Sequence, residues 1–166
     1  MELDTHADTC AFGQECLVVN DTGAQVSVEP FEQSLGSMKS VSVVTAAVAY
    51  DDPSTHHTYV MFFNQVLHIP SLDMHLTSSF QMRDHGVLVN DVPLLHTDYD
   101  SRTDSHHTVH IPSADVTLPL SLRGVMSGPL VRTPTWEEVN DLAQHKVTKC
   151  DPMGWWFMVF SLIYLM

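Results

Sequence analysis

The stretch of sequence that decides the fold is VSVVTAAVAYDDPSTHHTYVMFFNQVLHI, residues 41–69. It contains two long runs rich in apolar and β-branched residues, at 41–50 and 57–69, and such runs are typical of β-strands. The polar residues 51–57 separate the runs, and Pro53 stands where a proline favours a turn. The stretch therefore predicts a long, projecting β-hairpin with a polar tip, and with it a mainly β fold.

Short apolar runs, broken by Pro, Gly, Asn and Asp, continue on both sides of this hairpin. Residues 16–28 are typical of a second hairpin whose turn lies at 20–23. Residues 87–96 predict a further strand. In another, at 116–122, alternating apolar residues lie on one face; they are Val116, Leu118, Leu120 and Leu122.

Two short helices are expected beside the strands. Ser78 or Ser79 is placed to cap the first, which Gly86 would end. Thr135 and Glu138 have the spacing of a capping box at the start of the second. We therefore expect a domain at residues 1–132, a C-terminal helix at 133–146 and an apolar tail at 147–166.

The composition excludes several classes of function. The chain of 166 residues has 20 Asp and Glu against 7 Lys and Arg, which gives a net charge of −13. Because so acidic a protein repels phosphate backbones, we expect no nucleic-acid partner. The three cysteines include no Cys-x-x-Cys pair, which argues against a disulfide framework or a zinc knuckle and favours a reducing, intracellular setting.

The C-terminal residues 154–166, GWWFMVFSLIYLM, carry no charge. An ordinary membrane-spanning helix needs roughly 18–20 apolar residues, so the segment is too short for one, and we expect no membrane partner. Three interpretations stay open: a poor tail anchor, a buried strand, or an out-of-frame extension that selection never shaped. The last is favoured, and we expect residues 147–166 to be unstructured or foreign to the preceding domain.

Two Asp-Thr motifs stand near the N-terminus. Residues 21–24 read Asp-Thr-Gly-Ala, the literal signature of aspartic proteases, and residues 4–7 read Asp-Thr-His-Ala. Aspartic proteolysis needs two carboxylates that share one proton, because like charges so close cannot both ionise. The two motifs lie too near each other in the chain to belong to separate lobes of one enzyme. An active protease would therefore take its second aspartate from another copy of the chain.

The neighbouring residues connect the broken motif with a known family. Residues 2–13, ELDTHADTCAFG, resemble the active-site stretch of retropepsins, where apolar residues precede Asp-Thr/Ser-Gly-Ala-Asp-Thr. They also resemble its His-containing variant in the Gag-Pol polyproteins of copia-type retrotransposons from diatoms and other protists. Segments 18–31, 44–76 and 80–93 are similar to those polyproteins in the same order. The resemblance covers about residues 2–133.

This resemblance implies a retropepsin-like domain: a closed β-barrel with a flap hairpin and one or two short helices. It implies an aspartic endopeptidase that cleaves polyprotein peptide bonds as a homodimer in the cytoplasm or a virus-like particle, with no cofactor and no metal ion. Asp4 matches the catalytic aspartate, Thr5 the hydroxyl that braces its loop, and Ala7 the small residue that follows. His6 departs from the usual glycine. The hairpin at 43–65 matches the flap.

Alternatives to this interpretation stay open. Asp21 is the other candidate for the catalytic aspartate, although residues 20–23 are explained as a turn without any catalytic role. His6, the short lead-in before Asp4 and the unusual tail suggest a fragment of a longer polyprotein. They also suggest a degenerate remnant that acts at most as a β-rich interaction module.

Two other kinds of chemistry are less favoured. The candidate metal ligands are the pairs His56–His57 and His106–His107, with His110. Both pairs fall in expected loops, and adjacent strand residues point to opposite faces, so we expect no metal site. Cys10 stands near His6, but no third group is identifiable that would orient a cysteine nucleophile. We expect Cys10 to fill a small apolar hole.

Overall fold

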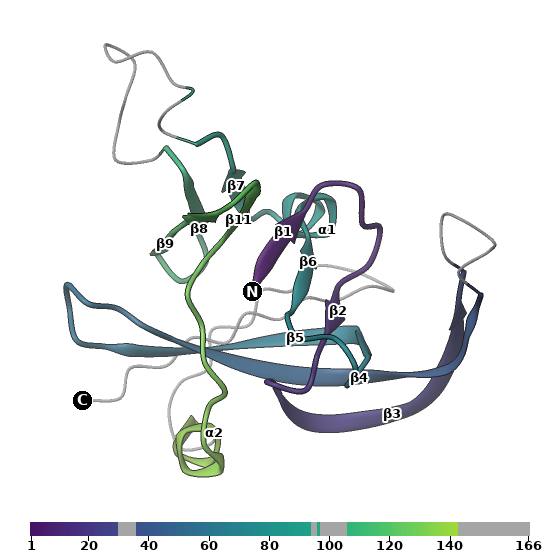
Figure 1. Ribbon diagram of the computed structural model, residues 1–166. Helices are drawn as coiled ribbons and strands as arrows, with labels where there is room; N and C mark the ends of the chain where they lie inside the picture. The colour runs from purple at the N-terminus through teal and green to yellow at the C-terminus, as the bar shows by residue number, and fades with distance from the viewer. Residues whose placement is uncertain (30–35, 94–95, 97–105, 143–166) are drawn as a thin grey trace.

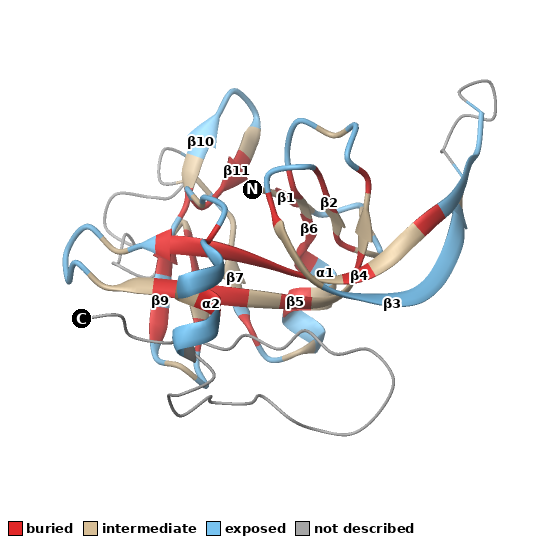
Figure 2. Cartoon of the chain, turned by 90° about the horizontal axis from the view of Figure 1, so that it is seen from below, coloured by how far each residue is buried: buried red, intermediate tan, exposed pale blue. Residues whose placement is uncertain are grey.

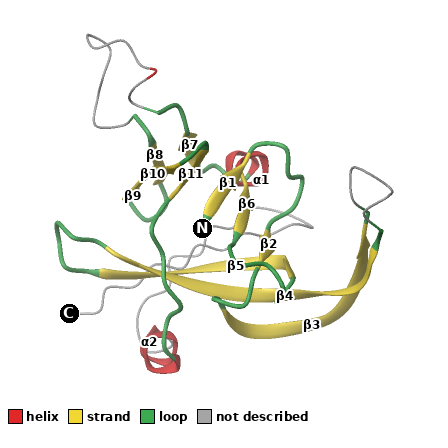
Figure 3. Cartoon of the chain, in the orientation of Figure 1, coloured by secondary structure: helices red, strands yellow, loops and turns green. Residues whose placement is uncertain are grey.

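The computed structural model describes residues 1–29, 36–93, 96 and 106–142. Strands dominate these residues (Figure 3), so the prediction of a mainly β fold is confirmed. In chain order the elements are β1 (Glu2–Asp4), β2 (Ala11–Phe12), β3 (Leu17–Val28), β4 (Met38–Asp51), β5 (Thr58–His68), β6 (Leu76–Ser78), α1 (Ser79–Asp84), β7 (Leu88–Asn90), β8 (Thr108–Ile111), β9 (Val116–Pro119), β10 (Ser121–Arg123), β11 (Met126–Gly128) and α2 (Trp136–Leu142).

The described strands form three open sheets. The largest has the order β1-β6-β2-β5-β4-β3, and the smaller ones have the orders β7-β8-β9 and β10-β11. The prediction of a closed barrel is wrong for the described residues, because the end strands β1 and β3 do not pair with each other. At the β1 end of the large sheet, β11 packs tightly against the N-terminal residues. A Cβ atom added at Gly128 would collide with the backbone of Met1. This neighbour covers β1 without extending its sheet.

The hairpin predicted from residues 41–69 is present. β4 and β5 pair in antiparallel fashion from Ser42↔His68 to Asp51↔Thr58. The expectation that this hairpin projects as a flap is wrong, because Ala46, Met61 and Phe63 are completely buried, and much of β4 and β5 has the colour of buried residues in Figure 2. A run that is apolar on both faces is stable only when both faces are covered. Within residues 41–69 only Asp51 and residues 53–56 at the tip are exposed, and the rest are buried or half-buried.

The strand pair that does project is β3 with the first half of β4, which we call the arm (Figure 1). β3 is continuous from Leu17 to Val28, and its residues from Asn20 to Ser27 are exposed. The predicted turn at 20–23 is therefore wrong. Gly23 has a φ of +76°, but it lies within an irregularity of β3 and does not reverse the chain.

Both predicted helices are present. Ser78 caps α1 by accepting a hydrogen bond from the Gln81 N–H, and Gly86 follows the helix with a φ of +77°. The capping box at α2 forms as predicted: the Glu138 N–H donates to Thr135 Oγ1 (3.1 Å), and the Thr135 N–H donates to Glu138 Oε2 (2.7 Å). Neither helix is long and apolar enough to cross a membrane, among the residues described.

α2 covers the face of the β4–β5 hairpin that lies away from the main core. Val139 packs with Ala47 and Val60 there. Arg132 fastens the two elements by ion pairs to Asp51 (2.7 Å) and Glu138 (2.6 Å). The predicted helix at 133–146 is therefore confirmed over Trp136–Leu142. Residues 133–135 are described but precede the helix, whereas residues 143–146 and the predicted tail at 147–166 lie outside the described residues.

The strand predicted at 116–122 is divided in two. Val116, Leu118 and Leu120 are buried as expected, but Leu122 is 41% exposed. The chain leaves β9 at Pro119, and Leu122 belongs to β10, which pairs with β11 in the separate two-stranded sheet. The common apolar face therefore ends at Leu120.

Candidate functional site

Asp4 lies at the end of β1, where the chain crosses a neighbouring strand. β1 runs parallel to β6, with Asp4 opposite Ser78, and β2 lies on the other side of β6 with Ala11 opposite Leu76. The loop of residues 5–10 therefore passes from one side of β6 to the other at the end where α1 begins. We call these residues together with Asp4 the Asp4 loop.

The start of α1 holds the Asp4 loop in place. The Ser78 hydroxyl donates to the Ala7 carbonyl (2.6 Å), and the Ser78 N–H donates to Cys10 Sγ (3.3 Å). The Cys10 N–H donates to Gln81 Oε1 (3.2 Å). These contacts span about seventy positions of sequence, so the loop conformation depends on the folded sheet.

The Asp4 side chain is partly buried and is held by its own loop. Its Oδ1 accepts a hydrogen bond from the His6 N–H (2.9 Å). Thr5 Oγ1 shares a hydrogen bond with His6 Nδ1 (3.2 Å). His6 is not among the residues with positive φ, so the histidine fits here without the left-handed backbone that favours glycine. Thr5 and His6 are both exposed.

Asp21 makes the same local contact in a different setting. Its Oδ1 accepts the Gly23 N–H (2.8 Å), as Asp4 accepts the N–H two residues on. Asp21 pairs with Val44 and Gln25 pairs with Ser42, so β3 carries two more residues than β4 over this interval. The Asp-Thr-Gly motif therefore forms a β-bulge on the exposed arm. Its carboxylate satisfies the backbone of that bulge.

A second bulge lies beside the first. Val44 pairs with Val66 while Ala46 pairs with Phe63, so β5 carries one extra residue. Gln65 lies in this interval with a φ of +57°, a left-handed conformation that is uncommon outside glycine. Bulges bend strands and increase their twist. The β3–β4 pairing has further register shifts between Val18 and Asn20 and between Val26 and Val28, and the arm is curved in Figure 1.

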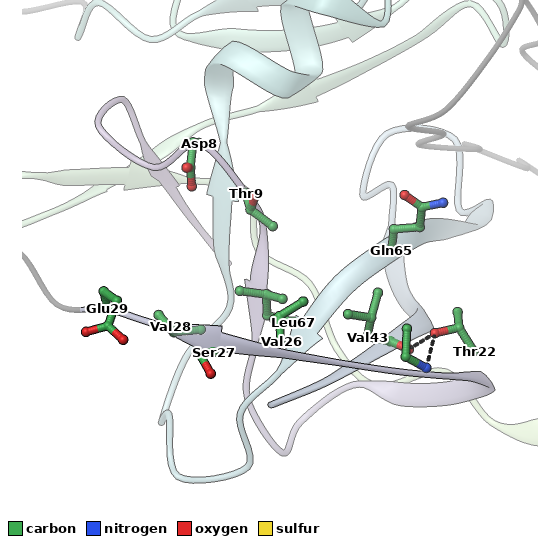
Figure 4. Close-up of a pocket in the computed structure, with 11 residues that line it drawn as sticks. Asp8, Thr9, Thr22, Val26, Ser27, Val28, Glu29, Val43, Gln65 and Leu67 are labelled. Carbon is green, nitrogen blue, oxygen red and sulfur yellow. Dashed lines mark hydrogen bonds between the residues drawn. The ribbon is translucent and has the colours of Figure 1, made fainter. Parts of the chain in front are cut away.

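The curved arm, β5 and the Asp4 loop line an open pocket of about 720 Å³ (Figure 4). This volume lies within the range of ligand-binding pockets in proteins. Asp4 is not part of the lining, but Asp8 and Thr9 of the Asp4 loop are. The lining residues are Asp8, Thr9, Thr22, Ala24, Val26, Ser27, Val28, Glu29, Val43, Gln65 and Leu67.

The cysteine chemistry considered above finds no support. Cys10 is 1% exposed, and burial raises the pKa of its thiol to about 11. Because the thiolate is the nucleophile, Cys10 is unreactive at neutral pH. It belongs to the main core, as predicted. No group of three His, Cys, Asp or Glu side chains within the described part of the chain could hold a metal ion.

His75 is a buried histidine that the sequence did not single out. Its Nδ1 accepts the Gly13 N–H (3.2 Å), its Nε2 donates to the Glu15 carbonyl (3.0 Å), and its ring stacks on Phe12 at 4.7 Å. This arrangement requires a neutral ring, and burial lowers the pKa of His75. His75 thereby joins the segment after β2 to the start of β6, close to the strands that carry the Asp4 loop.

We expect stability to fall in acid because of His75. Its pKa is lowered on folding, so below about pH 6.5 the unfolded chain binds the extra proton first. The free energy of unfolding should then fall by up to about 1.4 kcal/mol per pH unit, measured by urea unfolding between pH 7.5 and 5. His75→Asn keeps an acceptor for Gly13 and should flatten this dependence. His56→Asn, at the exposed hairpin tip, should leave the pH dependence unchanged. An equal pH dependence in both variants would contradict the assignment of the acid destabilisation to His75.

The sequence pattern missed most of the residues that shape the site. The sequence predicts Ser78 or Ser79 as a helix cap, but the bond of Ser78 to the Ala7 carbonyl and the role of Gln81 depend on distant pairing. Gln65 had no visible signal in the sequence, because a bulge becomes evident only when the register of two strands is known.

Comparison with known proteins adds no assignment, since no family profile, curated protein or solved structure matches the chain.

Proposed function

We propose that the chain is an aspartic endopeptidase of the retropepsin type, in which Asp4 pairs with Asp4 of a second copy. The observation that carries this proposal is the position of the Asp4 loop: it is fixed by α1, exposes Thr5 and His6, and lines a pocket large enough for peptide side chains. The sequence resemblance to retropepsins supports the same residue.

The chemistry needs only the two carboxylates and water. At a separation that allows one shared proton, one carboxylate is ionised and the other is protonated. The ionised group takes a proton from water as the oxygen attacks the peptide carbonyl carbon, while the protonated group donates to the carbonyl oxygen. Collapse of the tetrahedral intermediate breaks the C–N bond: the leaving nitrogen takes the proton that the first carboxylate received from water, and the second carboxylate takes a proton from a hydroxyl of the intermediate. No redox partner or metal ion is required.

The Asp4 loop has the rigidity that such a pair needs. Catalytic groups act best when their positions are fixed before the reaction. The bonds from Ser78 and Gln81 supply that support from a different part of the chain. The exposed Thr5 and His6 leave a surface on which a second copy can approach. Asp21 lies on the exposed arm, where its carboxylate bonds within its own bulge and the Thr22 hydroxyl donates to the Val43 carbonyl of β4 (2.6 Å). Its support comes from that one neighbouring strand and not from a helix start.

Cleavage of a random peptide mixture at pH 5–6 tests the proposal. We expect activity that pepstatin inhibits, and a specific activity that falls on dilution because a monomer holds half of the site. Circular dichroism at the assay pH confirms that the chain is folded. A folded protein that stays monomeric at high concentration and cleaves nothing would overturn the proposal and favour the non-catalytic remnant.

A further inference from the structure

The pocket between the arm and the Asp4 loop combines two kinds of surface. Its walls are aliphatic, with Val26 and Val28 from β3, Val43 from β4 and Leu67 from β5. In Figure 4, Val26 and Leu67 lie near the middle of the pocket. A ligand that enters between them must present an apolar stem to these side chains, since apolar surface gains most from apolar contact.

One end of the pocket is acidic. Asp8 and Glu29 lie toward the same end in Figure 4, while Gln65 and Thr22 lie toward the other. Among the described residues that line the pocket, none is Lys or Arg. Glu29 accepts a hydrogen bond from the Ser37 hydroxyl (2.6 Å), which is a neutral donor. The whole chain is acidic as well, which draws cations toward such a site.

We propose that this pocket receives a Lys or Arg side chain of an extended peptide, and that Asp8 and Glu29 select it. Such side chains place an aliphatic stem along apolar surface while the charged head stays at a polar edge. The pocket offers the matching order, with valine and leucine walls followed by two carboxylates. The proposal deepens the proposed function and rests on it for one consequence: cleavage sites should contain a basic residue at one fixed position.

Asp8 connects this pocket to the proposed chemistry. It is four positions after Asp4 in the Asp4 loop, and the bonds of Ser78 and Gln81 fix Ala7 and Cys10 on either side of it. A side chain bound at Asp8 is therefore held at a constant place relative to the proposed catalytic residue. Asp8 is an exposed specificity residue and not a catalytic one.

A pair of matched peptides tests the inference without relying on catalysis. The probes are acetyl-Val-Val-Arg-Val-Val-amide and its twin with citrulline, which keeps the shape of arginine and removes the charge. Binding is measured by methyl NMR of the full chain carrying Asp4→Asn, so that no cleavage occurs. We expect about fivefold tighter binding of the arginine peptide, the effect of roughly 1 kcal/mol from exposed charge pairs, with shifts at the Val26, Val43 and Leu67 methyl groups.

Variants of the acidic end separate the possible results. Asp8→Asn combined with Glu29→Gln should remove the preference for arginine, whereas Asp115→Asn, on the exposed turn before β9, should keep it. Equal binding of the two peptides, or shifts outside the pocket, would overturn the inference. Arginine-selective binding, together with no cleavage by the folded chain that retains Asp4, would uphold the pocket and refute the protease. Cleavage without any basic preference would refute the pocket and uphold the protease.

Discussion

Replacing Asp4 by Asn is expected to reduce peptide cleavage by about 10³-fold or more, with little change in fold. In a homodimer the substitution removes both carboxylates, and general acid–base groups contribute about 10²–10⁴-fold each. Asn retains an oxygen that can accept the His6 N–H, so the loop contact seen for Asp4 can persist. The rate constant for a cleaved reporter peptide and the thermal unfolding midpoint are the two measurements.

Asp21→Asn is the matched control for this experiment. Asp21 makes the same hydrogen bond to the N–H two residues on, at 2.8 Å against 2.9 Å for Asp4. Both substitutions remove one charge and keep one acceptor. We expect Asp21→Asn to retain cleavage within about a factor of two, the scale of a surface substitution. Loss of activity in Asp21→Asn and its retention in Asp4→Asn would reverse the assignment.

Replacing Phe12 by Ala is expected to destabilise the protein by about 3–5 kcal/mol, the usual range for a buried phenylalanine. Phe12 is completely buried on β2, between Phe63 (4.9 Å between ring centroids) and His75 (4.7 Å). β2 lies between β5 and β6, so a cavity there loosens the strands on which the Asp4 loop depends. The measurement is urea unfolding at pH 7.5.

Phe80→Ala gives the matched control for the core. Phe80 lies on α1 and is 67% exposed, so the same truncation should cost no more than about 0.5 kcal/mol. Because total stabilities are about 5–15 kcal/mol, Phe12→Ala should also lower the yield of folded protein. Equal effects of the two substitutions would show that Phe12 is not packed as described.

The strands and helix caps could be predicted from the sequence because their signals are local. The apolar runs at 41–50 and 57–69 identify β4 and β5, and the spacing of Thr135 and Glu138 identifies the start of α2. Local signals do not show which strands are covered by other parts of the fold and which are exposed to solvent. The hairpin predicted as a projecting flap is therefore the buried centre of the sheet, and the exposed arm is formed by β3.

The Asp-Thr-Gly motif at residues 21–23 is another case in which a local sequence signal leaves the structure undecided. A glycine with positive φ is needed in a hairpin turn and in a β-bulge alike, so residues 20–23 predict a bend without saying which kind. The register of β3 against β4 decides for the bulge. The Asp4 loop likewise gains its support from Ser78 and Gln81. No local sequence pattern predicts contacts between residues so far apart in the chain.

The stoichiometry of pepstatin binding tests the central claim most directly. Native mass spectrometry of the full chain, titrated with pepstatin at pH 5–6, counts inhibitors and chains in the same particle. The proposed pairing of Asp4 with its twin predicts one inhibitor per two chains, and no binding by Asp4→Asn. One inhibitor per single chain, or unchanged binding by Asp4→Asn, would contradict it.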